Sequence, residues 1–219
     1  MKKLMFVLSL MIWVNPAHSM IIMSNVTGAD MAGVAVTITF DGGGSETVNW
    51  VTTSTVSSIA NNEGYAGGAF GTGWSLTQQG DTFGDITGTD LLGVWTFTNN
   101  SGVPLLSLAI DALMANIVFD NLFTVEGTPG SDPGRPFTPD VTNAPTSVVY
   151  SDLFSAPDLY GSLTLDWGQI GLASGSTFRF MADTDAVPEP ATLLLFGAGL
   201  LGLAGVRAKK RLPTINSEV

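Results

Sequence analysis

The 219-residue chain contains no cysteine and a single histidine, His18. It also contains no lysine between Lys3 and Lys209. These absences exclude thiol catalysis, thiolate metal sites, a Schiff-base lysine and the lysine of a phosphate-binding loop. If His18 lies in a segment that is removed on export, Ser-His-Asp triads and histidine-ligated zinc are excluded as well. Only carboxylate chemistry is left, and we expect the protein not to be an enzyme.

Positive charge is also scarce. The chain has 8 Lys and Arg residues against 19 Asp and Glu residues, and six of the eight basic side chains lie near its two ends. Residues 20–190 contain only Arg135 and Arg179 beside 18 carboxylates, so this interval carries a formal charge of −16. Proteins that bind a phosphate backbone need clustered Lys or Arg side chains. We therefore expect no nucleic-acid partner.

Residues 1–19 have the three parts of a secretory signal peptide. Lys2 and Lys3 form a short basic start, and an apolar run follows over residues 4–14. Such a run spans about 16 Å as a helix, which is too short to cross a bilayer. Small residues before a new N-terminus are typical of a signal-peptidase site, which is formed here by three residues: Ala17, Ser19 and Met20. An uncleaved anchor or a buried N-terminal helix is the alternative.

The opposite end contains a second apolar segment. Residues 191–206 include no charged side chain, and a basic cluster follows at once: Arg207, Lys209, Lys210 and Arg211. Because Lys and Arg beside a membrane span stay on the cytoplasmic side, we expect a transmembrane helix with the preceding domain outside. Residues 212–219 would then form a short cytoplasmic tail. A buried core helix is the alternative, although its four glycines would weaken it in water.

A four-residue motif stands directly before this segment: Val187, Pro188, Glu189 and Pro190. With the Leu-, Gly- and Ala-rich stretch and the basic cluster, residues 187–211 closely resemble the PEP-CTERM sorting signal of Gram-negative bacteria. The resemblance implies recognition by an exosortase, a membrane enzyme that cleaves near Pro-Glu-Pro and releases the domain or transfers it to the cell surface. It thus implies a transient inner-membrane anchor with the domain in the periplasm, followed by a surface or extracellular location. Many carriers of this signal are linked to extracellular polysaccharide and the biofilm matrix.

The interval between the two signals, residues 20–186, has the pattern of a β-domain. Apolar and polar side chains alternate with period two, as in half-buried strands, over eight segments: 34–40, 47–53, 93–99, 105–111, 116–120, 147–151, 162–167 and 177–182. Residues 111–115 could form one turn of helix. Short strands separated by Gly, Asn, Asp and Pro predict an all-β fold, an antiparallel sandwich or a jelly-roll-like domain.

Glycine-rich segments predict the connections. Residues 41–44 indicate a tight hairpin, since glycine supplies the positive φ that such a turn requires. Residues 61–75 and 127–145 are expected to be long loops. The first of these contains three aromatic residues: Tyr65, Phe70 and Trp74. Their rings could stack on sugars, or they could fold back onto the core, and the former would make the domain a carbohydrate-binding module.

Carboxylates remain as a chemical resource. A glycoside hydrolase would need two of them facing each other in a cleft, a pairing that sequence spacing does not reveal. Asp183 and Asp185 follow the last predicted strand, where hard oxygen ligands would suit Ca²⁺. The alternative, which we favour, is a polar exit into the linker, with no cofactor.

The terminal signals and the missing nucleophiles together favour a non-enzymatic exported protein. Its expected partners are an exosortase, the inner membrane before processing, and an exopolysaccharide. A carbohydrate-binding module is the alternative, and a carboxylate-dependent glycoside hydrolase is favoured less.

Overall fold

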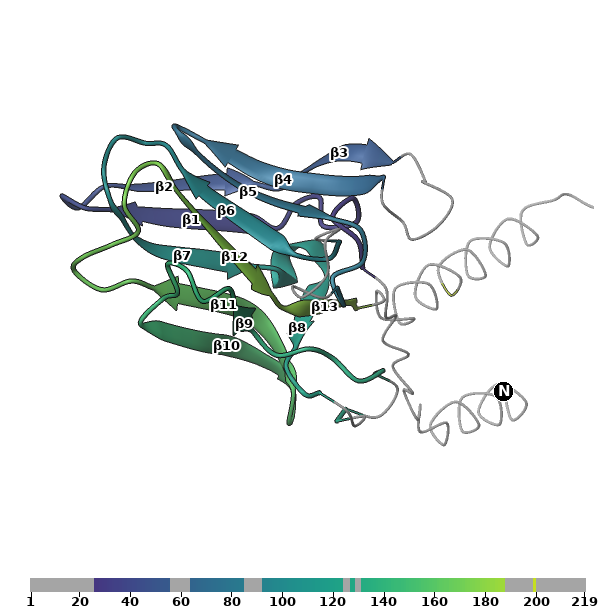
Figure 1. Ribbon diagram of the computed structural model, residues 1–219. Coiled ribbons are helices and arrows are strands. Elements are labelled where there is room, and N and C mark those ends of the chain that lie inside the picture. Colours follow the sequence, from purple (N-terminus) through teal and green to yellow (C-terminus); the bar gives the residue numbers. More distant parts are fainter. Residues whose placement is uncertain are drawn as a thin grey trace, which may run out of the picture. The chain divides into compact units, whose positions relative to one another are not determined.

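The computed structural model describes residues 26–55, 64–84, 92–123, 127, 128, 131–187 and Gly199. Those residues form two antiparallel β-sheets (Figure 1). The first sheet consists of β1 (Ala35–Phe40), β2 (Ser45–Asn49), β7 (Leu105–Asp111), β8 (Ile117–Asp120), β10 (Ser147–Ser155), β11 (Leu159–Asp166) and β13 (Asp183–Ala186). The second consists of β3 (Val51–Thr55), β4 (Tyr65–Gly71), β5 (Trp74–Gln79), β6 (Trp95–Asn99), β9 (Thr138–Pro139) and β12 (Ser176–Met181).

Strand β11 organises the first sheet. One of its edges pairs with β10, and the other pairs with β7 over Ser162–Asp166 and with β8 at Leu159 and Tyr160. The short 3₁₀ turn η1 (Leu113–Ala115) separates β7 from β8, so these two strands run in tandem along one edge of β11. Strands β1 and β2 extend the sheet beyond β7, and β13 pairs with β8.

The second sheet has the order β3-β4-β5-β6-β12-β9. The chain passes between the sheets at Trp50, between β2 and β3, and at Ala182, between β12 and β13. A tryptophan anchors each crossing. The Trp50 indole N–H donates to the Gly28 carbonyl over 2.8 Å, and the Trp95 indole N–H donates to the Ala182 carbonyl over 2.9 Å. Their rings meet edge to face at 5.4 Å, so the two crossings support each other.

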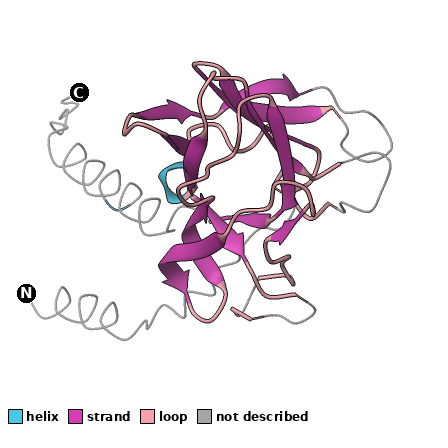
Figure 2. Cartoon of the chain, turned by 60° about the vertical axis from the view of Figure 1, so that its left-hand side comes forward, coloured by secondary structure: helices cyan, strands magenta, loops and turns pink. Residues whose placement is uncertain are grey.

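The core lies between the sheets and is built from the inward side chains of both. Figure 2 shows the strands surrounding this interior. Its largest members are aromatic, and Phe97, Phe178 and Phe180 are fully buried. Phe178 and Phe180 stack on each other at 5.6 Å, and Phe180 stacks on Trp95 at 5.7 Å. Aliphatic residues of β1, β7 and β11 close the core from the first sheet.

The all-β prediction is confirmed, and so are the hairpin at 41–44 and the helical turn near residue 113. The single strand expected at 47–53 is wrong. The alternation of side chains continues through Trp50, but the backbone turns there into the other sheet. Pattern alone does not reveal such a corner, because β2 and β3 follow each other without a turn signal.

The long loop expected at residues 61–75 is also wrong where the structure describes it, because β4 and most of the β4–β5 hairpin lie there. The glycines of β4 mark close packing. A Cβ atom on Gly67 would overlap the Trp50 indole nitrogen and the Gly28 carbonyl. Only a residue without a side chain lets the corner tryptophan approach this strand.

Two further strands lie where loop or linker was expected. The short strand β9 interrupts residues 127–145, and β13 covers the expected exit at Asp183 to Ala186. The sequence Asp-Thr-Asp-Ala has low intrinsic strand propensity. Its conformation is imposed by pairing with β8.

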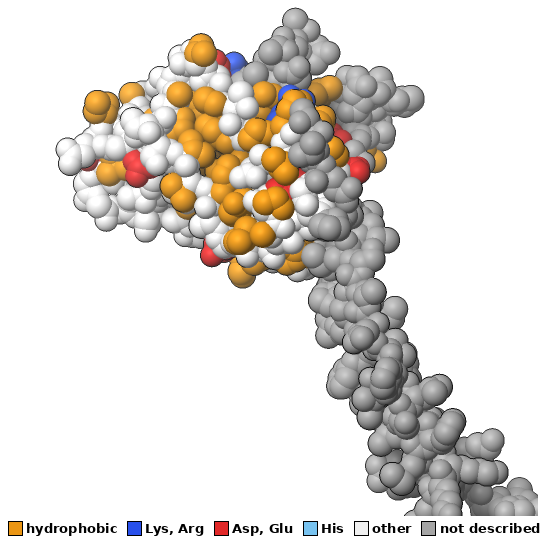
Figure 3. Space-filling view, turned by 90° about the horizontal axis from the view of Figure 1, so that it is seen from below, with side chains coloured by type: hydrophobic (Ala, Val, Ile, Leu, Met, Phe, Trp, Pro, Cys, Tyr) orange, Lys and Arg blue, Asp and Glu red, His pale blue; other side chains and the backbone are white. Residues whose placement is uncertain are grey.

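Strand β10 forms an edge of the first sheet. Its outward side chains Val149 and Leu153 are 51% and 58% exposed. Figure 3 views the molecule from this side and shows hydrophobic side chains gathered over the face. The register shifts between Leu153 and Ser155, and Asp152 adopts a positive φ of 56°. Such a bulge protects an exposed edge from pairing with another chain.

Candidate functional site

The folded domain continues to the first residue of the expected sorting motif. In the β8–β13 ladder the register runs from Asp183 opposite Asp120 to Ala186 opposite Ile117. The Val187 N–H then donates to the Asn116 carbonyl over 2.8 Å, and its side chain packs beside β8. The next residue is a proline, which has no N–H to extend the ladder.

Most of the predicted sorting residues lie outside the described part of the chain. This applies to Ala17, Ser19, Met20, Pro188, Glu189, Pro190, Arg207, Lys209, Lys210 and Arg211, and to residues 191–206 except Gly199. Among the described residues, no helix has both the length and the apolar character needed to cross a bilayer.

A cluster of buried carboxylates lies beside this junction. Asp120 on β8, Asp183 and Asp185 on β13, and Asp158 before β11 are each exposed by 6% or less. They come from three separate parts of the sequence. Figure 1 shows β8 and β13 adjacent in the fold. The sequence alone points to Asp183 and Asp185 but not to Asp120 and Asp158, because the proximity of these residues depends on the sheet pairing.

Hydroxyl groups from loops donate hydrogen bonds to these carboxylates. The Thr82 hydroxyl lies 2.9 Å from Asp183 Oδ1, and it accepts the Thr184 N–H over 3.1 Å. The Thr128 hydroxyl lies 2.6 Å from Asp158 Oδ1. Each buried acid therefore has a partner, as buried polar groups generally must.

Ser131 joins β8 to β13. Its Oγ lies 3.1 Å from Asp120 Oδ2, 2.9 Å from Asp185 Oδ2 and 3.1 Å from the Asp132 carbonyl. A serine hydroxyl carries one proton, so it can donate to only one of these three oxygens. When it donates to one carboxylate, the other carboxyl group needs a proton of its own to form a hydrogen bond with Ser131. A protonated Asp185 or Asp120 would supply it by donating to the Ser131 oxygen.

The electrostatics agree with this proton count. Burial, and after it the charge of Asp185, together raise the pKa of Asp183 to about 8. Burial also raises the pKa of Asp185 to about 7, with a smaller contribution from Asp120. The pKa of Asp120 is raised mainly by burial and next by the Asp158 carboxylate. Near neutral pH the cluster therefore retains protons that exposed carboxylates would have lost.

This arrangement stabilises the last strand and offers little to an outside ligand. In the described part of the chain, no three or more His, Cys, Asp or Glu side chains are grouped as a metal site. Serine and threonine hydroxyls stand between the carboxylates. All four carboxylates are exposed by 6% or less, so a polymer substrate could not reach them unless the segments that cover them moved. Calcium binding at Asp183 and Asp185 was the less favoured expectation from the sequence, and no observation tests it.

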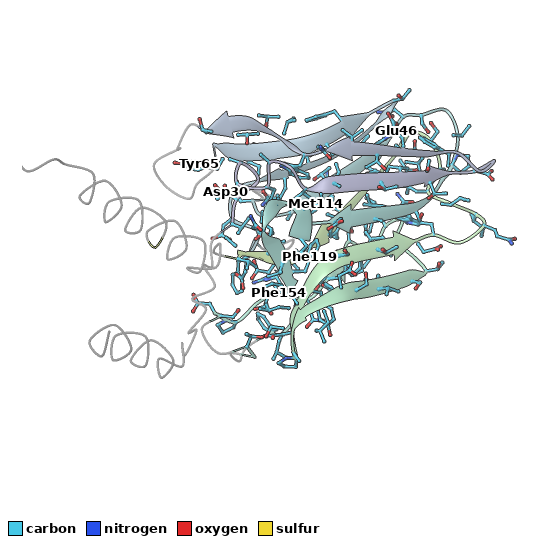
Figure 4. All side chains as sticks on the ribbon, turned by 180° about the vertical axis from the view of Figure 1, so that it is seen from behind. Asp30, Glu46, Tyr65, Met114, Phe119 and Phe154 are labelled. Atoms are coloured by element: carbon cyan, nitrogen blue, oxygen red, sulfur yellow. The ribbon has the colours of Figure 1, made fainter. Side chains whose placement is uncertain are left out.

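The three aromatic residues expected on a loop have different positions. Trp74 is 4% exposed, and its indole N–H donates to Glu46 Oε2 over 2.7 Å. Its ring packs edge to face on Phe97 at 6.4 Å, so it belongs to the core. Figure 4 shows Glu46 and Tyr65 at opposite ends of the strands. Phe70 points outward from β4 and is 49% exposed. Of the three aromatic residues, it is the one whose side chain is exposed.

Comparison with known proteins identifies the C-terminal segment. Residues 186–211 match the family model described as the PEP-CTERM protein-sorting motif. The chain therefore carries this motif, as predicted, and the motif implies export and sorting by an exosortase. The match leaves the β-domain uncovered. No curated protein and no solved structure matches the chain.

Proposed function

We propose that this protein is an exported β-sandwich that an exosortase processes and that serves the cell envelope or exopolysaccharide matrix without catalysing a reaction. The sorting motif at residues 186–211 is the observation that carries the proposal. The absence of cysteine and, after removal of His18, of imidazole supports a non-enzymatic role.

The position of the motif suggests how sorting would proceed. The signal peptide would direct the chain to export. Residues 191–206 would then hold it in the inner membrane, with the basic cluster in the cytoplasm. Because Val187 pairs with the sandwich, Pro188 directly follows the folded domain in sequence. The exosortase would therefore act directly beside β13.

Substitution of the motif tests this proposal. In the native host, Glu189→Ala should leave the full-length chain in the inner-membrane fraction, whereas the wild-type protein is recovered at the surface or in the medium with a new C-terminus. Glu218→Ala, which removes a carboxylate of the tail, is the matched control and should be processed normally. Mass spectrometry of the recovered protein reads both termini. Recovery of the wild-type chain from the cytosol with residues 1–19 intact would overturn the proposal.

A second candidate function is carbohydrate binding, and the exposed ring of Phe70 on the second sheet favours it. An aromatic face exposed on a rigid strand is a suitable platform for a sugar ring. Tyr65, Phe70 and Trp74 do not form one platform, as the sequence had suggested, because Trp74 lies in the core.

A further inference from the structure

The outer face of the second sheet has an unusual charge pattern. Because side chains alternate along each strand, the residues between the core positions point outward. On β4, β5, β6 and β12 these are Ala66, Gly68, Phe70, Ser75, Thr77, Gln79, Thr96, Thr98, Thr177 and Arg179. None is acidic, although the interval from residue 20 to 190 has a formal charge of −16.

The outer face of the first sheet differs in this respect. It carries Asp111 on β7, Asp152 on β10 and Asp166 on β11. Asp152 accepts a hydrogen bond from the outward Ser162 over 2.6 Å. An anionic polymer would be repelled from that face, so the second sheet is the face it could approach.

The Phe70 ring lies over Gly68 of the same strand. A Cβ atom built on Gly68 would lie 2.7 Å from Cζ of the Phe70 ring, so the ring covers the space that a side chain at position 68 would fill. Part of the ring thus contacts the strand, and the side chain is half exposed. The glycine therefore permits an aromatic platform on an otherwise hydroxyl-rich surface.

Arg179 lies in the same cross-strand row as this platform. Gly68 pairs with Thr77, Thr77 with Thr96, and Thr96 with Arg179. Three strand spacings of about 4.8 Å place Arg179 roughly 14 Å from the ring, with threonine side chains between them. Nε of Arg179 is buried and has no hydrogen-bond partner among the described residues.

We propose that this face binds a polysaccharide that contains uronic acid residues, with one sugar ring on Phe70 and a carboxylate at Arg179. The inference rests on the proposed function, because only an exported protein would meet such a polymer. The aromatic ring supplies a stacking surface, the threonine hydroxyls supply hydrogen bonds, and the guanidinium supplies the charge that selects an acidic sugar.

Affinity electrophoresis of the full chain in detergent tests the proposal, with polygalacturonate in the gel and pullulan as the neutral comparison. Polygalacturonate should retard the wild-type chain, and pullulan should not. Phe70→Ala and Arg179→Gln should each weaken the affinity about tenfold, the loss of one stacking or ionic contact. Phe70→Leu, which still covers Gly68, should weaken binding similarly, and Arg179→Lys should retain part of it.

Val149→Ala and Arg135→Gln are the matched controls, since they remove an exposed apolar side chain and a guanidinium elsewhere. Both should bind as the wild type does. The absence of retardation in polygalacturonate, equal retardation in pullulan, or unchanged binding of Phe70→Leu and Arg179→Gln would overturn the inference. Cell fractionation of the same strain reports separately on sorting, so correct processing without polymer binding would refute this inference alone.

Discussion

Asp183 lies directly opposite Asp120 in the β8–β13 ladder, and both side chains are buried. Two carboxylates at facing positions of a sheet would repel each other if both were ionised. The Thr82 hydroxyl donates to Asp183, and Ser131 lies between Asp120 and Asp185. The strand that precedes the sorting motif therefore depends on protons and hydroxyl groups for its place in the sheet.

Stability should fall as the pH rises through the range in which this cluster ionises. The pKa values of Asp183 and Asp185 are about 8 and about 7, raised by burial from the ordinary value of 3.8. The folded domain therefore holds protons that the unfolded chain loses above about pH 4, and their stabilising contribution is lost as the pH rises through 7 and 8. Asp183→Asn and Asp185→Asn should melt at a higher temperature than the wild type at pH 8.5. The difference should shrink toward pH 4.

Asp41→Asn is the control for this measurement, because Asp41 is an exposed acid in the β1–β2 turn. Its melting temperature should follow the wild-type profile at every pH. If Asp183→Asn and Asp185→Asn were no more stable than the wild type at pH 8.5, the carboxylates would not be destabilised by ionisation, and the account of the cluster would fail.

The Thr82 hydroxyl should contribute more to stability than an exposed one. Thr82→Val keeps the shape of the side chain but removes the donor to Asp183 and the acceptor of the Thr184 N–H. Leaving these buried groups unpaired should reduce the free energy of unfolding by about 1–3 kcal/mol. Thr37→Val breaks the exposed Thr37–Thr47 hydroxyl pair and should change it by less than about 0.5 kcal/mol. Urea titration of both variants measures the difference, and equal effects would contradict it.

Gly134 should not tolerate a methyl group. A Cβ atom there would overlap the carboxyl group of Asp120, which is held on both sides by the sheet and by Ser131. Gly134→Ala should therefore destabilise the domain by about 1–3 kcal/mol, the usual cost of overpacking. Gly44→Ala, where the new atom would meet only Phe40 at 3.8 Å, is the paired variant and should be nearly neutral in thermal denaturation. A neutral Gly134→Ala would show that the cluster can rearrange.

Glu46 links the two sheets near the β1–β2 turn. It accepts the Trp74 indole N–H over 2.7 Å and the Thr72 N–H over 3.0 Å. These bonds, the one from Thr72 first, hold its pKa below the ordinary value of 4.5. The contribution is present above pH 4.5 and is lost as the pH falls through the lowered pKa. Glu46→Gln should reduce the free energy of unfolding by about 1 kcal/mol or less at pH 7, because solvent screens the hydrogen bonds of this partly exposed carboxylate. The substitution should have no effect once Glu46 is protonated. A cost that stayed constant down to pH 2 would contradict this.

Much of the fold follows from local pattern. The alternation in residues 34–40 and 105–111 predicted β1 and β7 closely, because one face of each strand packs on the core and the other meets solvent or a polar surface. Turn chemistry predicted the hairpin at 41–44 for a similarly local reason. The errors came where glycine served close packing, as at Gly67, and where polar residues formed a buried strand, as in β13.

The candidate site was less predictable. Asp183 and Asp185 were candidates because they are close in sequence. Asp120 and Ser131 are 63 and 52 positions away from Asp183 and share no sequence motif with it. Their contact requires the β8–β13 pairing. Phe70 was proposed as a sugar platform for its type alone, and its position over Gly68 depends on the conformation of β4.

The sequence by itself determined the sorting signal of this protein, because an exosortase recognises such a motif as a short contiguous segment whose residues act in chain order. The tertiary structure decided which carboxyl groups are buried together and which tryptophans anchor the crossings between the sheets. It also decided that the outward side chains of β4, β5, β6 and β12 include no acidic residue. Those properties arise from strands far apart in the chain, and burial and pairing exist only once the two sheets have packed.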